Sequence, residues 1–336
     1  MSQQTIPYLL TAYGTPHRMG YLKTLSGESH PRPLSVIDLM DEAVELKLAG
    51  VEIPVDRLGE IPLIAIKEAL NERKMRIVAD TMTVLEADVV QWRTLLENSA
   101  FLGAKVVRTL LSGILCGDRR GFSGGWENHF QACVARLKEI LPIVSDLGLC
   151  IAVENHQDAT TEDLLNLHDA LKCHPDFGVV LDTGNPLAVG QDPVQAAKDL
   201  SHLIRHLHLK DYTIHFAPEG YRLVRCANGE GVIDFPEILS IVSRNGHELM
   251  PGIEIAAQAT RTIPVLESTW WDQLPAREAK EFTPTLQILW EKGKNKGEPY
   301  SSAWESGENS EKVSLEERSI LEKSSRYFHS LHRKIT

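Results

Sequence analysis

Short runs of apolar residues recur along the chain and alternate with longer segments whose apolar residues follow a helical period. The runs are apolar at consecutive positions, as strands buried on both faces are. They predict eight strands, over Tyr8–Tyr13, Val51–Val55, Arg76–Val84, Val106–Leu111, Cys150–Glu154, Phe177–Leu181, Ile204–Leu209 and Gly252–Ile255. Between the runs the spacing predicts helices, which include Ser35–Ala49, Glu86–Leu102, Trp126–Leu147, Thr161–Leu171 and Pro193–Leu203.

Capping signals support several of these helix ends. Thr160 and Asp192 stand at helix starts, where a hydroxyl or carboxylate accepts from free backbone N–H groups. Gly50, Gly103 and Gly148 follow predicted helices, as left-handed C-caps do. These signals place the turns between predicted strands and helices.

Eight strands that alternate with helices favour a closed (β/α)8 TIM barrel over an open doubly wound sheet. An open dinucleotide-binding sheet would carry a glycine-rich turn after its first strand. The first predicted strand is followed by Gly14-Thr15-Pro16-His17, which lacks that pattern. We therefore predict an α/β protein with a TIM barrel.

The pattern changes after about residue 274. Phe282–Glu291 predicts one more helix, and Lys292–Val313, rich in Lys, Gly, Ser and Glu, predicts a flexible linker. Ser314–Ile335 regains helical spacing. We divide the chain into a catalytic barrel domain, residues 1–280, and a C-terminal helical extension, residues 281–336. The last helix either docks on its own barrel or reaches a partner subunit.

Composition narrows the class of partner. The net charge of -11 over 336 residues argues against nucleic acid, whose phosphates are bound through Lys and Arg. The five cysteines are scattered and form no C-x-x-C pair, which indicates reduced thiols. No stretch approaches the ~20 apolar residues of a membrane span, and the first residues lack a signal-peptide pattern. A cytoplasmic protein without a membrane partner is expected.

Metal-competent side chains stand at the ends of four successive predicted strands, the fifth to the eighth: Glu154, Asp182, His208 and Glu254. The strand ends of a barrel converge at its active face, because adjacent strands stand ~4.8 Å apart. One such residue alone is commonly part of a structural ion pair. Three carboxylates held so close would repel one another unless a cation neutralised them. The set predicts a site for one divalent metal ion: Mn2+, Mg2+ or Co2+.

The segments around these four residues, V-E-N, L-D-T-G-N, H-L-H-L-K-D and G-I-E-I, resemble the xylose isomerase-like TIM-barrel superfamily, also called the sugar phosphate isomerase/epimerase family. The resemblance spans roughly Val51 to Trp271, and Asn228–Glu237 is similar to the family's turn into the seventh helix. It implies metal binding by the four residues named above. Endonuclease IV, a member with further His and Asp ligands, is disfavoured because that full set has no counterpart here.

A metal chelated by a carbonyl and its neighbouring hydroxyl stabilises the negative charge of an enediolate. The expected function is therefore a divalent-metal-dependent sugar or sugar-acid isomerase/epimerase, with Glu154 and Glu254 as the proton-transfer pair. The alternative is a lyase on the same site, a decarboxylase or dehydratase of an oxo sugar acid. A non-catalytic sugar-binding barrel is the third class, disfavoured because a binder needs no pair of bases. The family's ketose epimerases carry His where this chain has Asn185.

Lys210 is the third expected catalytic residue, as a cation for a substrate carboxylate, phosphate or enolate oxygen. Its structural alternative is an ion pair with Asp211. The run His208-Leu209-Lys210-Asp211 is similar to H-x-K-D runs in inositol-type dehydratases of the superfamily, and this similarity favours the lyase alternative. Other residues near the predicted strand tips are candidate substrate contacts: His17, Arg108, His156, Asn185 and Arg261. The expected partner is a small sugar or sugar acid, and a homo-oligomer is the other partner considered.

Overall fold

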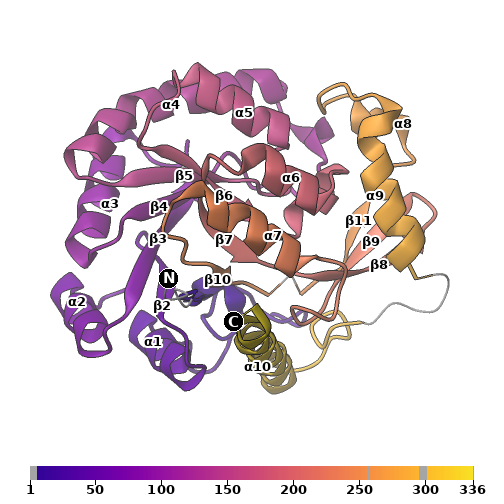
Figure 1. The fold of residues 1–336 in the computed structure, drawn as a ribbon. Helices are drawn as coiled ribbons and strands as arrows, with labels where there is room; N and C mark the ends of the chain where they lie inside the picture. The colour runs from indigo at the N-terminus through magenta and orange to yellow at the C-terminus, as the bar shows by residue number, and fades with distance from the viewer. Residues whose placement is uncertain (1–5, 256–257, 295–300, 336) are drawn as a thin grey trace.

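The structure is a computed structural model that describes residues 6–255, 258–294 and 301–335, with backbone alone for 332–335. Eight parallel strands close into a barrel, because β1 pairs with both β2 and β10 (Figure 1). In barrel order the strands are β1 (Leu9–Thr11), β2 (Gly50–Pro54), β3 (Arg76–Thr83), β4 (Val106–Leu110), β5 (Cys150–Glu154), β6 (Phe177–Asp182), β7 (Ile204–Leu209) and β10 (Gly252–Ile253). The predicted TIM barrel is confirmed.

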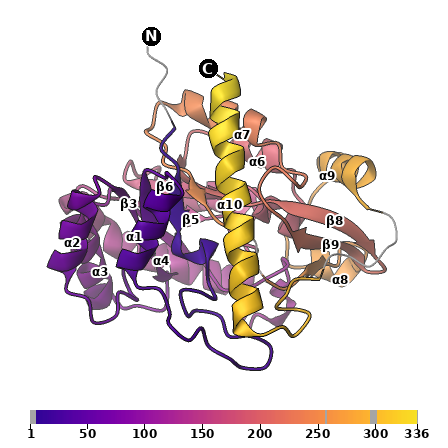
Figure 2. The ribbon, with the colours of Figure 1, turned by 90° about the horizontal axis from the view of Figure 1, so that it is seen from below.

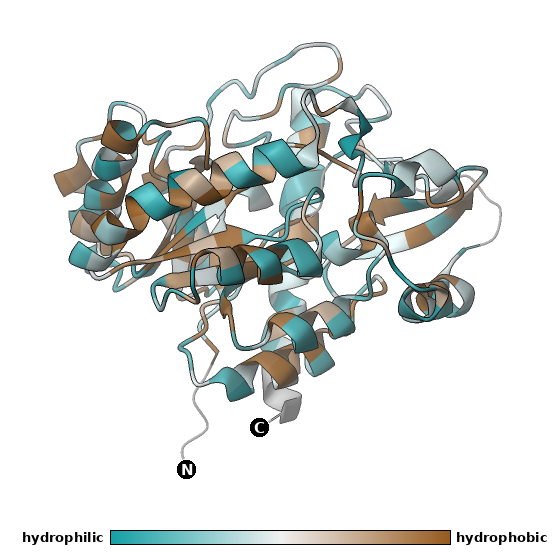
Figure 3. Ribbon diagram, turned by 90° about the horizontal axis from the view of Figure 1, so that it is seen from above, coloured by the Kyte–Doolittle hydropathy of each residue, from teal (hydrophilic) through white to brown (hydrophobic). Residues whose placement is uncertain are grey.

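Helices surround the barrel, and their sequences alternate between hydrophobic and hydrophilic residues (Figure 3). They are α1 (Val36–Glu45), α2 (Leu63–Glu72), α3 (Val89–Leu102), α4 (Trp126–Asp146), α5 (Thr161–Ala170), α6 (Pro193–Leu200), α7 (Phe235–Val242) and α10 (Ser310–Ile335). Helices α8 (Ser268–Trp271) and α9 (Ala279–Lys292) lie to one side of the barrel (Figure 1). Short 3-10 helices cover Ala12–Gly14, Arg119–Gly121, Asn185–Val189 and Ser243–Asn245. No described helix is both long and apolar enough to cross a membrane.

Helix α10 lies between α1 and α7, where the eighth helix of a TIM barrel packs (Figures 1 and 2). The Phe328 ring lies 5.0 Å from the ring of Tyr8, which precedes β1, and 5.1 Å from that of Phe235 in α7. Arg318 forms an ion pair with Glu42 of α1. The predicted C-terminal helix therefore docks on its own barrel. The domain boundary predicted at residue 280 stays a prediction.

A small antiparallel sheet stands apart from the barrel, formed by β8 (Tyr212–Ala217), β9 (Gly220–Arg225) and β11 (Arg261–Ile263) (Figure 1). The hairpin β8–β9 turns through Pro218 and Glu219, and β11 pairs with β9. The sequence patterns did not predict this sheet. The hairpin β8–β9 follows β7 directly and β11 follows β10, so the sheet borders the strand ends that carry the candidate residues.

Most predicted caps are confirmed. Thr160 and Asp192 are N-caps that accept from backbone N–H groups, and Gly103 caps α3 with φ 97°. The cap predicted at Gly50 is wrong, because Gly50 begins β2 and Lys47 takes the left-handed conformation after α1, with φ 58°. A Cβ on Gly50 would lie 2.1 Å from the Arg76 carbonyl oxygen, so close strand contact requires glycine there.

The connection to α10 differs in detail from the predicted linker, Lys292–Val313. Residues 295–300 of that range lie outside the described residues. In the described part, Ser302 is buried and its hydroxyl donates to the Gln258 carbonyl at 2.7 Å. Helix α10 begins at Ser310 and not at Ser314, because the Asn309 side chain accepts from the backbone N–H of Lys312 and starts the helix earlier.

Candidate metal centre

Two sets of side chains point into the barrel interior, a layer of apolar side chains and, further along the same strands, the polar side chains. Residues two apart on a strand point to the same side, so Glu154 lies above Ala152 and Asp182 above Val180. Ala152 and Val180 belong to a separate buried cluster, which comprises Leu9, Val78, Val106, Ala152, Val180 and Met250. The intervening strand residues, such as Val153 and Leu181, face the helices and join the main core. Polar side chains are thus collected at one end of a closed apolar barrel.

The four residues predicted to bind metal come together at this end. Ligand atoms of Glu154, Asp182 and His208 all lie within 4.8 Å of one another, and all three residues are buried. Glu254 joins them, since its Oε2 lies 3.0 Å from His208 Nδ1. The side chain of Glu254 is 11% exposed, against 1% for Glu154 and none for Asp182. Glu254 is therefore the member of the set most open to a substrate.

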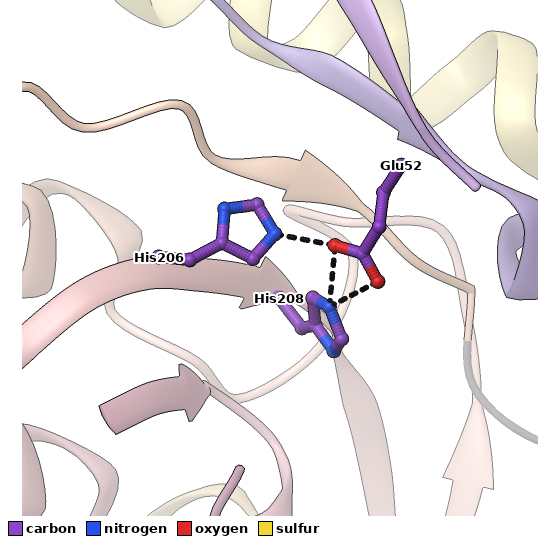
Figure 4. A group of neighbouring side chains, drawn as sticks. All are labelled: Glu52, His206 and His208. Carbon is purple, nitrogen blue, oxygen red and sulfur yellow. Dashed lines mark hydrogen bonds and ion pairs between the residues drawn. The ribbon is translucent and has the colours of Figure 1, made fainter. Parts of the chain in front are cut away.

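His208 presents its two ring nitrogens to different partners. Nε2 lies 2.9 and 3.0 Å from the two carboxylate oxygens of Glu52, as Figure 4 shows. Nδ1 lies 3.0 Å from Glu254 Oε2 and 3.4 Å from Glu154 Oε2, yet makes no well-directed hydrogen bond within the described residues. A histidine that ligates a metal commonly donates its other N–H to a carboxylate. This arrangement fits a ligand that uses Nδ1.

The donor set fits a divalent ion that prefers oxygen and imidazole ligands. Three carboxylates and one imidazole, with no thiolate, suit Mg2+, Mn2+ or Co2+ better than a structural zinc site. The Asp182 carboxylate is oriented through its Oδ1, which accepts hydrogen bonds from the backbone N–H groups of Gly184 at 2.8 Å and Asn185 at 3.0 Å. Its Oδ2 is thereby turned toward the cluster.

Glu154 is held by an arginine from the neighbouring strand. The Arg108 guanidinium donates to Glu154 Oε2, at 2.7 Å from Nε, and to Asp80 Oδ1, at 2.6 Å from Nη1. The Asn185 side-chain amide donates to Glu154 Oε1 at 3.0 Å. Burial alone would raise the pKa of Glu154, but the charges of Arg108 and His208 hold that pKa well below its usual range. Glu154 is an ionised, immobilised carboxylate.

Lys210 lies between two of the predicted ligands. Its Nζ is 2.7 Å from Asp182 Oδ2 and 2.7 Å from Glu254 Oε1. Burial alone would lower the pKa of Lys210, but these two carboxylates raise it well above its usual value. Burial alone would raise the pKa of Glu254, yet Lys210 and His208 lower it to about 2.

The structural alternative for Lys210, an ion pair with Asp211, is not what the structure has. Asp211 accepts from backbone N–H groups in the turn into α7, at 2.9 Å from Gly229, 3.0 Å from Gly231 and 3.1 Å from Ile233. A Cβ on Gly231 would lie 2.2 Å from Asp211 Oδ1, so this turn requires glycine. Asp211 thus holds the turn Asn228-Gly229-Glu230-Gly231 in place, and Lys210 pairs with Asp182 and Glu254 instead.

The candidate substrate contacts have different surroundings. Arg108 and Asn185 both bind Glu154, as described above. The ring nitrogens of His17 lie 2.7 Å from the Leu22 carbonyl oxygen and 2.8 Å from the Ser310 hydroxyl, so the His17 ring joins the first loop to α10. Their predicted contacts with substrate stay predictions.

His156 and Arg261 keep buried nitrogens without hydrogen-bond partners among the described residues, Nδ1 and Nε respectively. Burial lowers the pKa of His156 to about 4. The hydroxyl of Tyr212, which the sequence analysis did not single out, is likewise buried and unpartnered among the described residues. The Tyr212 ring packs beside this centre, because a Cβ on Gly184, whose backbone N–H donates to Asp182, would lie 2.7 Å from Tyr212 Cε2. These three side chains have hydrogen-bonding groups to offer a ligand.

Sequence reasoning also missed Glu52 and His206. Glu52 Oε2 lies 2.5 Å from His206 Nε2 as well as 2.9 Å from His208 Nε2 (Figure 4). Burial alone would raise the pKa of Glu52, but the two imidazoles hold it well below its usual range. The available signal was one acidic residue inside the apolar run Gly50–Pro54, where an uncompensated charge is costly.

The chain belongs to the Xylose isomerase-like TIM barrel family, whose sequence profile matches residues 40–272. The chain is 23% identical over 207 residues to the uncharacterized protein YihM of Escherichia coli strain K12, which covers 60% of this chain and 61% of YihM. It is 25% identical over 125 residues to the 3-oxo-isoapionate decarboxylase of Pectobacterium atrosepticum, with 36% and 44% covered. It is 29% identical over 143 residues to the inosose dehydratase of Clostridium botulinum, with 36% and 45% covered.

These matches span less than two thirds of each relative. Solved structures extend the likeness over most of the chain. The 3-keto-D-glucoside 4-epimerase of Escherichia coli matches with a TM-score of 0.56 and 14% identity, over 80% of this chain and 97% of that one. A xylose isomerase-like TIM barrel protein from Mycobacterium smegmatis in complex with magnesium matches with a TM-score of 0.57 and 15% identity, over 85% and 97%. At these identities the likeness concerns the fold.

Proposed function

We propose that this chain is a divalent-metal-dependent enzyme that acts on a small sugar or sugar acid, with Glu154, Asp182, His208 and Glu254 as metal ligands. The observation that carries the proposal is that Glu154 and Glu254 approach His208 Nδ1, while ligand atoms of Glu154, Asp182 and His208 lie within 4.8 Å of one another. A divalent ion held there would supply Lewis-acid polarisation of a substrate carbonyl and its neighbouring hydroxyl. The membership of the family and the magnesium complex of a protein with the same fold support this proposal.

The roles of the two glutamates follow from their surroundings. Both oxygens of Glu154 are engaged, Oε2 by Arg108 and Oε1 by Asn185, so Glu154 acts as a fixed ligand. Glu254 is the more exposed carboxylate, and we assign it the removal of a proton from the carbon next to the substrate carbonyl. In an isomerase the same carboxylate, after exchange with solvent, would give a proton to the former carbonyl carbon, while the proton of the neighbouring hydroxyl passes to the former carbonyl oxygen. The asymmetry favours a one-base isomerase over an epimerase that uses two free carboxylates on opposite faces.

A second candidate is a lyase, a dehydratase or decarboxylase of an oxo sugar acid. It is favoured by the position of the Lys210 ammonium, 2.7 Å from Glu254 Oε1. An acid beside a base is what elimination of water needs. Glu254 would take the C–H proton, and Lys210 would give a proton to the departing hydroxyl, which leaves as water. The decarboxylase and dehydratase among the relatives are consistent with this candidate.

Solvent deuterium separates the two candidates. The Mn2+-loaded protein is incubated in D2O with a panel of ketoses and oxo sugar acids, and products are followed by NMR and mass spectrometry. An isomerase incorporates deuterium into a product of unchanged composition, whereas a lyase releases water or CO2. Glu254→Gln is the control that should stop both reactions. Binding of a sugar without exchange or turnover would instead favour the third class, a non-catalytic sugar-binding barrel.

A further inference from the structure

Glu52 is a carboxylate placed in the interior of the barrel where the sequence provides only apolar neighbours. It is the central residue of β2, whose five residues are all buried, and it is itself 1% exposed. A buried carboxylate without partners would be expensive. The partners of Glu52 come from β7, 154 and 156 residues further along the chain. The barrel closure therefore brings this carboxylate to the histidine that offers Nδ1 to the metal centre.

The geometry of Glu52 determines which nitrogen of His208 carries hydrogen. Carboxylate oxygens accept hydrogen bonds, so a ring nitrogen that binds them donates. Both oxygens lie within 3.0 Å of His208 Nε2, and Oε2 is also 2.5 Å from His206 Nε2. A divalent ion that displaced the proton from Nδ1 would leave the remaining hydrogen on Nε2, and the Nδ1 lone pair would face Glu254 and Glu154.

We propose that Glu52 is the positioning residue of the centre, which fixes His208 with hydrogen on Nε2 and the Nδ1 lone pair toward the metal, while His206 anchors the Glu52 carboxylate. This inference rests on the proposed function, because it takes His208 to be a metal ligand. The rings of His206 and His208 lie 5.2 Å apart and perpendicular, so one carboxylate meets both Nε2 atoms (Figure 4). Among the described residues, the Glu52 side chain hydrogen-bonds to His206 and His208 and to none of the other three proposed ligands.

Glu52→Gln tests the proposal because the amide keeps the size of the carboxylate. Since both Glu52 oxygens lie near His208 Nε2, either orientation of the amide places an NH2 group against that nitrogen. The Nε2 hydrogen would then have one neutral amide oxygen in place of two charged carboxylate oxygens, and the NH2 group beside it would be a competing donor. The conflict is relieved when His208 moves its hydrogen to Nδ1 or turns its ring, and both responses remove the lone pair from the centre. Loss of a group that orients a ligand typically weakens metal binding by ~10–100-fold.

The experiment measures Mn2+ affinity by calorimetry on the chelated protein, together with the fold by circular dichroism. We expect Glu52→Gln to bind Mn2+ ~10–100-fold more weakly than the wild type. Glu42→Gln is the matched control, because Glu42 is a buried carboxylate that pairs with Arg18 and Arg318 and not with the centre. Glu42→Gln should keep the wild-type affinity. Wild-type affinity in a folded Glu52→Gln protein would overturn the inference and leave the proposed function standing.

A second measurement needs no variant. In Mg2+-loaded wild-type protein labelled with 15N-histidine, NMR reports which ring nitrogen of His208 carries hydrogen. We expect hydrogen on Nε2 and a metal-shifted Nδ1, a result that a merely structural role of Glu52 would not require. Hydrogen on Nδ1, or a metal-shifted Nε2, would overturn the inference even if Glu52→Gln fails to fold. A wild-type protein that binds neither ion would instead remove the proposed function.

Discussion

Arg108 provides a quantitative test of how the centre is held together. Its side chain is 7% exposed and bridges two buried carboxylates, Asp80 and Glu154. Arg108→Met keeps much of the apolar stem and removes the charge, so both carboxylates lose their cation. Breaking a buried ion pair by removing one partner costs roughly 3–5 kcal/mol. For 336 residues, with an unfolding entropy of about 2.1 cal/mol/K per residue, this loss lowers Tm by about 4–7 °C.

The assay is thermal unfolding of metal-free protein, followed by circular dichroism at neutral pH. Arg76→Met is the matched control, because Arg76 is 43% exposed and its partner Glu248 is 62% exposed. An exposed ion pair contributes about 0–1 kcal/mol, so the control should change Tm by less than about 2 °C. If Arg108→Met unfolds within about 1 °C of the control, the reasoning that Arg108 stabilises the two buried carboxylates, Asp80 and Glu154, is refuted.

Three further predictions concern single side chains. Glu254→Gln should lower kcat at least ~10²-fold with the fold intact, as loss of a positioned base does; near-normal turnover would move this role elsewhere. Glu317→Ala should lower the free energy of unfolding, measured by urea titration, by roughly 2–4 kcal/mol, because Glu317 accepts hydrogen bonds from the backbone N–H groups of His17 and Arg18. Glu311→Ala, at an exposed position of the same helix, should change this free energy little. Burial raises the pKa of Asp158 from 3.8 to about 7, so its contribution to stability is fully present below pH 3.8 and is lost as the pH rises to about 7. The Tm of Asp158→Asn relative to wild type should therefore rise between pH 5 and pH 8, and a constant difference would count against this pKa.

The sequence predicted the barrel because buried parallel strands have a simple signature, consecutive apolar residues between helices. It also predicted that Glu154, Asp182 and His208 meet, because residues that end neighbouring parallel strands necessarily lie at the same face. Strand order and alternation are enough for that inference. Both predictions depend only on local patterns and on the topology.

What the sequence did not predict depends on contacts between distant segments. Glu52 lies within a strand, and nothing local indicates that its partners follow 154 and 156 residues later. Arg108 was expected to contact substrate, because its position at a strand tip does not say which carboxylate it faces. The pattern predicted helix α10, but its place between α1 and α7 comes from packing against Tyr8 and Phe235.

The most direct test of the central claim is the metal content and activity of one preparation. The protein is chelated, verified as metal-free by elemental analysis, and titrated with Mn2+ and Mg2+ alongside Asp182→Asn. We predict one ion per chain, loss of turnover in the metal-free protein with recovery on reloading, and strongly weakened binding in the variant. Full turnover in verified metal-free protein, or unchanged binding by Asp182→Asn, would contradict the claim that these strand ends form a catalytic metal centre.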